Sequence, residues 1–132
     1  MIFIKKAAFI GSVLLILYFT MRSHTFLEIG TQSGGVNTTL FRSIQTEVSR
    51  GFYLNTVGNI ILFIPYGLAL GLIFKENRLI KAAAAGAALS TAIELIQIFM
   101  PNRWTDIDDV MLNTFGTLIG CMAAFLFPWI KK

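Results

Sequence analysis

The chain has 132 residues, of which 55% are apolar and only 14% are charged, and its mean hydropathy is +0.70. These values exclude a soluble domain of this length, because small proteins cannot bury so large an apolar fraction. The net charge of +4 does not indicate nucleic-acid binding, since the Lys and Arg residues stand in short clusters between apolar runs. We therefore predict an integral membrane protein.

The first apolar run extends from residue 7 to residue 21 and follows the basic pair Lys5 and Lys6. A basic flank before a short apolar run is also typical of a secretory signal peptide. The end of this run, from Tyr18 to Arg22, is bulky and lacks the small residues that a cleavage site requires. We therefore expect the run to be retained as the first transmembrane helix.

A polar segment, residues 23–50, follows the first run. Its first half is rich in Gly and Ser, and its second half has an apolar residue at every fourth position, namely Val36, Leu40, Ile44 and Val48. This spacing predicts a short amphipathic helix on the outer face of the membrane, with Asn37 placed to cap it. The helix could be a lid over a binding site or a connector, and we favour the connector.

Three longer apolar runs follow, at residues 52–74, 79–100 and 107–130. Each is long enough to cross about 30 Å of hydrocarbon as a helix. With the first run they predict an all-α membrane protein, in which residues 1–132 form a single domain of four transmembrane helices. The pairs Gly67/Gly71 and Gly116/Gly120 indicate close packing of helices, which we expect within one protomer rather than between two.

The basic residues predict that both termini lie in the cytoplasm. With the N-terminus inside, the inner flanks contain seven of the eleven basic residues, namely Lys5, Lys6, Lys75, Arg78, Lys81, Lys131 and Lys132. The outer segments then contain five of the seven acidic residues, namely Glu28, Glu47, Asp106, Asp108 and Asp109. Because cytoplasmic loops carry the excess of Lys and Arg, this orientation is favoured over the reverse.

Polar side chains gather near the outer ends of the last three runs. Residues three or four apart share a helix face, which groups Asn55 with Asn59, Glu94 with Gln97, and Asp106 with Asp109 and Asn113. Arg103 lies in the adjoining loop, whereas Asp108 points away from the face of Asp109. Polar groups are costly in hydrocarbon, so this layer predicts an outward-facing pocket. Its predicted ligand-binding residues are Asn59, Glu94, Gln97, Arg103, Asp106, Asp109 and Asn113.

The alternative is that these residues only hold the helices together by hydrogen bonds. Cys121 is the single cysteine and His24 the single histidine, so the sequence has no zinc-ligand spacing. We predict no cofactor and no metal site. The sequence does not decide whether a hard divalent cation binds between Asp106 and Asp109.

Two stretches carry a family resemblance. Residues 59–67, which include Asn59, Phe63, Pro65 and Gly67, resemble the first signature of the VanZ-like membrane family. The second signature is similar to the pattern Ser90, Glu94, Gln97, Pro101, Arg103, Asp106, Asp109, Asn113, Gly116 and Gly120. The resemblance implies a multi-pass protein of the bacterial cytoplasmic membrane, in the cell envelope, linked to resistance against glycopeptide antibiotics of the teicoplanin type. It implies no particular reaction.

The leading hypothesis is a binding module for an amphiphilic ligand, either a lipid-linked cell-wall intermediate or a lipoglycopeptide antibiotic. Arg103 would contact phosphate or carboxylate, and the acidic residues would contact amines or hydroxyls. An alternative is an intramembrane enzyme that modifies a lipid head group, with Glu94 as general base. A third possibility is a structural subunit of a membrane complex. The sequence predicts no oligomeric state.

Overall fold

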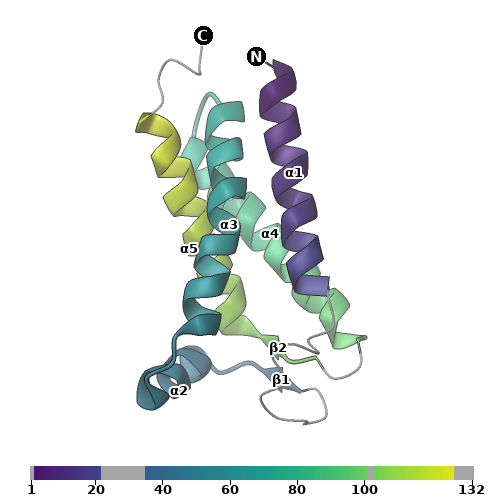
Figure 1. Ribbon diagram of the computed structural model, residues 1–132, viewed down its shortest axis with the longest axis vertical. Helices are drawn as coiled ribbons and strands as arrows, with labels where there is room; N and C mark the ends of the chain where they lie inside the picture. Colours follow the sequence, from purple (N-terminus) through teal and green to yellow (C-terminus); the bar gives the residue numbers. More distant parts are fainter. Residues whose placement is uncertain (1, 22–34, 101–102, 127–132) are drawn as a thin grey trace.

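The computed structural model describes residues 2–21, 35–100 and 103–126. Four long helices dominate it, namely α1 (Ile2–Met21), α3 (Leu54–Ile73), α4 (Arg78–Ile98) and α5 (Ile107–Ala123), and the short η1 (Ala124–Leu126) continues α5. Figure 1 shows α1, α3 and α5 side by side along the long axis, with α4 crossing behind them. Within the described residues, four helices are long and apolar enough to cross a membrane. The prediction of four such helices is therefore confirmed.

The helix bounds follow the predicted ones closely, except at the start of α1. This helix begins at Ile2 instead of residue 7, because Lys5 and Lys6 are good helix formers although they are not apolar. Hydropathy marks where the apolar run begins, which is not where the helix must begin. Residues 127–130, which were assigned to the fourth span, lie outside the described residues.

Helices α3 and α5 approach each other closely along their small residues. A Cβ atom added at Gly67 of α3 would overlap the carbonyl oxygen of Thr117, and one added at Gly120 of α5 would overlap that of Ile64. Small residues permit such backbone contact where no hydrophobic force drives helices together. The two GxxxG pairs therefore pack against the facing helix of the same chain, as predicted.

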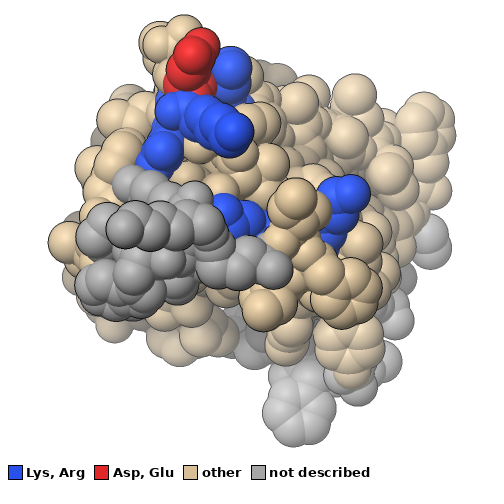
Figure 2. All heavy atoms as spheres, turned by 90° about the horizontal axis from the view of Figure 1, so that it is seen from above, with Lys and Arg blue, Asp and Glu red and all other residues tan. Residues whose placement is uncertain are grey.

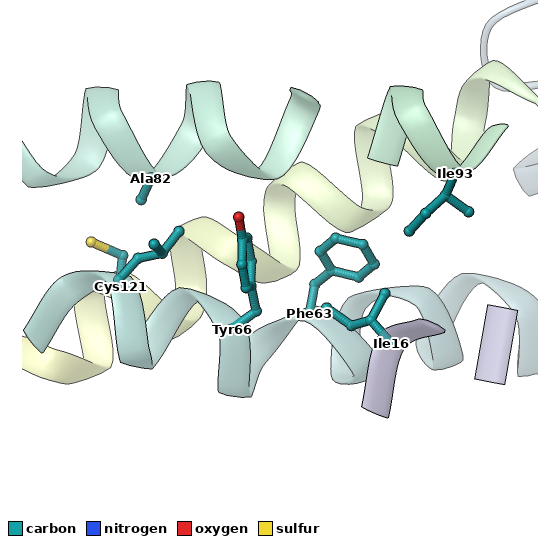
Figure 3. Packing of buried hydrophobic residues seen from close by; sticks show 7 residues of the cluster. Ile16, Phe63, Tyr66, Ala82, Ile93 and Cys121 are labelled. Carbon is teal, nitrogen blue, oxygen red and sulfur yellow. The ribbon is translucent and has the colours of Figure 1, made fainter. Parts of the chain in front are cut away.

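The apolar core lies where α1, α3 and α4 meet (Figure 3). Phe63 and Tyr66 of α3 contact each other edge to face, with ring centroids 6.1 Å apart. Ile16 of α1 and Ile93 of α4 are buried against them. Cys121 of α5 is also buried, where it packs as a small apolar side chain. Many large apolar side chains of the four helices point outward instead, as expected where lipid is the solvent.

The amphipathic helix exists as α2 (Arg42–Arg50), but its predicted cap is wrong. Asn37 belongs to β1 (Val36–Asn37), which pairs in parallel with β2 (Thr105–Asp106). The residue before α2 is Phe41, whose φ of 64° lies in the left-handed region. A single right-handed helix therefore cannot extend from Val36 into α2. The apolar spacing thus continues through a strand and a turn before the helix begins.

The two ends of the molecule differ in charge. The polar end contains α2, β1 and β2 at the bottom of Figure 1. Apart from Glu76, it contains every acidic residue of the described ranges, namely Glu47, Glu94, Asp106, Asp108 and Asp109. The basic end comprises the start of α1 and the α3–α4 turn, and its cations are Lys5, Lys6, Lys75, Arg78 and Lys81. Figure 2 views this end and shows Lys and Arg side chains far in excess of acidic ones.

Candidate polar site

Asp106 joins three segments that are distant in sequence. Its Oδ1 accepts hydrogen bonds from Asn37 Nδ2 (3.0 Å) and from the Asp108 N–H (2.9 Å), so it caps the start of α5. Its other oxygen accepts a hydrogen bond from the hydroxyl of Ser43. The Asp106 N–H in turn donates to Glu94 Oε2 (2.9 Å). Asp106 is buried, and each of these hydrogen bonds holds one part of the fold against another.

Asp108 performs the capping that was predicted for Asn37. Its fully buried carboxylate accepts hydrogen bonds from the backbone N–H groups of Phe41 (2.6 Å) and Ser43 (2.9 Å) at the start of α2. A carboxylate at this position satisfies free donors and complements the helix dipole. Sequence reasoning missed this role, since the contact joins residues more than sixty positions apart.

Helix α2 is held at its other end as well. Both carboxylate oxygens of Glu47 accept hydrogen bonds from the first turn of α3, from the N–H groups of Asn55 (3.1 Å) and Thr56 (3.0 Å). The Thr56 hydroxyl adds a third bond (2.6 Å). Because α2 is tied to both α3 and α5, it is a docked connector rather than a free lid.

Asp109 has a different set of partners. One carboxylate oxygen accepts hydrogen bonds from the side-chain amides of Asn59 (2.7 Å) and Asn55 (3.1 Å), both on α3. No donor among the described residues contacts its second oxygen. Asn55 is exposed, and Asp109 and Asn59 are half-buried. Asp109 is therefore a carboxylate with spare acceptor capacity at the surface of the bundle.

Arg103 lies half-buried beside two of the carboxylates. Burial lowers the pKa of its guanidinium, whereas the negative charges of Glu94 and Asp109 raise it. An arginine keeps its charge in such a setting. Its Nε is buried without a hydrogen-bond partner in the described part of the chain. The cation is thus electrostatically coupled to both acids while its own donors are not all used.

The remaining predicted residues connect helices. Gln97 donates from Nε2 to the Thr20 carbonyl oxygen (2.9 Å), which joins α4 to α1. Asn113 donates to Ser90 Oγ (2.8 Å), which joins α5 to α4, and its Oδ1 is buried without a partner among the described residues. Both contacts resemble those of a helix-packing network.

The structure thus separates the seven predicted site residues into two sets. Asn59, Asp109, Arg103 and Glu94 come together, and Asn55 joins them; we call these five residues the polar site. Asp106, Gln97 and Asn113 make contacts that hold elements in place. The described ranges contain no group of three or more potential metal ligands. The oxygens of Asp106 already accept hydrogen bonds from protein donors, so the pair of Asp106 and Asp109 is not arranged around a cation.

These features define a class of protein, a small bundle with four potential membrane-spanning helices and a carboxylate–amide–guanidinium site at one end. Residues 8–128 match the family model described as VanZ/LLP1, and the chain belongs to this family. It is also similar to Protein VanZ of Enterococcus faecium, with 39% identity over 70 residues. The aligned segment covers 53% of this chain and 44% of that protein. No solved structure matches the chain.

Proposed function

We propose that the chain binds an amphiphilic ligand at the polar site, on the outer side of the bacterial cytoplasmic membrane. The ligand is a lipid-linked cell-wall intermediate or a lipoglycopeptide, and its binding contributes to resistance against glycopeptide antibiotics of the teicoplanin type. One observation carries the proposal: Asp109 and Arg103 keep unused hydrogen-bonding capacity, whereas the adjacent Asp106 and Asp108 have their partners within the fold.

The chemistry of the polar site suits such a ligand. A guanidinium with free donors binds phosphate or carboxylate, and a carboxylate with a free oxygen accepts from amines and hydroxyls. Large aromatic side chains are exposed at the same end, among them Tyr53, Phe99 and Trp104. Aromatic residues prefer the membrane–water interface, where a polar head group and an acyl chain meet. Together these groups favour an amphiphile over a small soluble ion.

An enzyme that modifies a lipid head group is the less favoured function. Its proposed general base, Glu94, is buried and accepts a hydrogen bond from the Asp106 N–H. The sequence has a single histidine, His24, and offers no Ser–His or Cys–His pairing that would favour a covalent mechanism. The remaining alternative is that the protein is a purely structural subunit of a membrane complex. Susceptibility measurements on single variants distinguish this alternative from ligand binding.

The test is teicoplanin susceptibility of cells that express single variants, normalised to the amount of protein in the membrane. Asp109→Asn removes the charge but keeps a similar size, and we expect it to abolish protection at normal abundance. Glu76→Gln is the matched control, because it removes a carboxylate at the basic end, and it should protect like the parent.

Two results would count against the proposal. Protection by Asp109→Asn equal to that of the parent would exclude a functional role of this carboxylate. If the Asp109→Asn protein is no longer found in the membrane, the result would favour a purely structural role of Asp109. In that case the variant Arg103→Lys tests ligand binding independently. This variant keeps the charge but loses the fork of donors. At normal abundance it should weaken protection if the guanidinium binds the ligand, and unchanged protection would contradict binding.

A further inference from the structure

A pocket at the basic end has a chemistry unlike that of the polar site. Its volume is about 460 Å³, and its lining consists of Lys75, Asn77, Arg78, Leu79, Ile80 and Phe125. These residues come from the α3–α4 turn, the first turn of α4, and η1. The pocket therefore lies at the level where the helices leave the hydrocarbon, at the opposite end from Asp109.

Arg78, one of the two cations that line this pocket, is held in place by contacts that leave part of its guanidinium unpaired. Arg78 donates from Nε to the Lys75 carbonyl oxygen (3.3 Å), and its guanidinium carbon lies 5.4 Å from the ring centroid of Phe125. These two contacts fix the guanidinium plane. Its Nη1 is buried and has no hydrogen-bond partner among the described residues. A buried donor without a partner is costly unless a ligand supplies the acceptor.

The surroundings favour an anion at this point. Asn77, which precedes α4, makes no capping hydrogen bond with its side chain, and the first turn of the helix contains no acidic residue. The N–H groups of that turn add positive potential to the two cations. The adjacent Glu76 is the acidic residue of the turn, and it is exposed and does not line the pocket.

The apolar part of the lining identifies the type of anion. Ile80 and Phe125 are large and exposed, at 73% and 46%, next to the two cations. A free phosphate would make no use of these side chains, whereas a phospholipid would place its acyl chains along them. Basic pockets between transmembrane helices are known to bind anionic lipid head groups. We propose that this pocket binds an anionic phospholipid, with Arg78 and Lys75 on its phosphate.

Native mass spectrometry of the full chain in detergent tests the proposal. The probes are phosphatidylglycerol, phosphatidylcholine with the same acyl chains, and inorganic phosphate. Phosphatidylglycerol should be retained preferentially, because its net negative charge attracts both cations. The variant Lys75→Ala/Arg78→Ala should lose affinity for this lipid by about tenfold or more. Lys5→Ala/Lys6→Ala is the matched control, since it removes two charges at the same end outside the pocket, and it should retain the lipid.

Equal loss in both double variants would overturn the proposal, because the effect would then come from net charge alone. Displacement of the lipid by an equal concentration of inorganic phosphate would assign the pocket to free phosphate instead. If the double variant does not fold, Lys75→Gln replaces it, since Lys75 is exposed. Unchanged preference for phosphatidylglycerol in Lys75→Gln would also contradict the proposal.

Discussion

Asp108 and Asp109 are neighbours in sequence, yet their carboxylates face different kinds of donor. Asp108 is bonded to backbone N–H groups at the start of α2, which cannot turn away without unwinding the helix. Asp109 is bonded to the side-chain amides of Asn55 and Asn59, which can rotate. A carboxylate held by rotatable donors can exchange one of them for a ligand at low cost, whereas a helix cap cannot. This difference assigns Asp108 to the fold and Asp109 to the polar site.

The cap predicts a large loss of stability when Asp108 is replaced by Ala. The N–H groups of Phe41 and Ser43 would lose a charged acceptor that is itself fully buried, and the loss of such a helix cap costs about 2 kcal/mol. Thermal unfolding in detergent measures the effect. Glu76→Ala is the control, because this exposed carboxylate should change stability by less than about 0.5 kcal/mol. Equal melting temperatures for the two variants would exclude a capping role.

Helical spacing alone was enough to separate these two acids, since adjacent residues of a helix differ by about 100° in direction. It could also group Asn55 with Asn59 on α3. It could not identify the partner of Asp108, because that partner is a turn on a distant segment and not a position on the same helix. The same limit explains why Asp106 and Gln97 were expected at a ligand, although their contacts join elements of the fold.

At the scale of elements, the contact between α3 and α5 depends on residues without side chains. A methyl group at Gly120 would overlap the carbonyl oxygen of Ile64, and backbone atoms cannot move aside as a flexible side chain can. Gly58 is in the same helix as Ile64, and a Cβ atom there would meet nothing within 4 Å. The two glycines therefore form a matched pair for substitution.

We expect Gly120→Ala to destabilise the protein and Gly58→Ala to leave it unchanged or more stable. Alanine favours a helix by up to about 1 kcal/mol relative to glycine, and only the overlap at Gly120 outweighs that gain. Melting temperatures of the two variants in one detergent measure the difference. A higher melting temperature for both variants than for the parent would mean that α3 and α5 pack less closely than the glycines imply.

The elements themselves differ in how far the sequence could predict them. The spans were predictable, because about twenty apolar residues have few alternatives to a membrane-crossing helix. The start of α2 was not, because the apolar spacing of residues 36–48 also fits a strand followed by a turn. The pairing of β1 with β2 depends on two residues each, which is too short for a periodic signal.

On the scale of the whole molecule, the two ends of the protein differ in charge. At the polar end, acidic side chains cap helices and belong to the polar site. At the basic end, Lys and Arg side chains lie near the α3–α4 turn and predominate over acidic ones (Figure 2). The apolar band between them contains the core of Phe63 and Tyr66 and an outward surface of exposed Ile and Leu. The sequence predicted this division from residue order alone, because each charged cluster stands at the end of an apolar run.

The division also predicts the orientation. Cations remain on the cytoplasmic side of bacterial membranes, so the basic end should face the cytoplasm and the polar site the outside. Cysteines at Ser49 of α2 and at Glu76 of the α3–α4 turn test this in a Cys121→Ser background, since both positions are exposed. On intact cells an impermeant thiol reagent should label Ser49→Cys, and it should label Glu76→Cys only after permeabilisation. The reverse pattern would place the polar site in the cytoplasm, where a ligand presented at the outer leaflet cannot reach it.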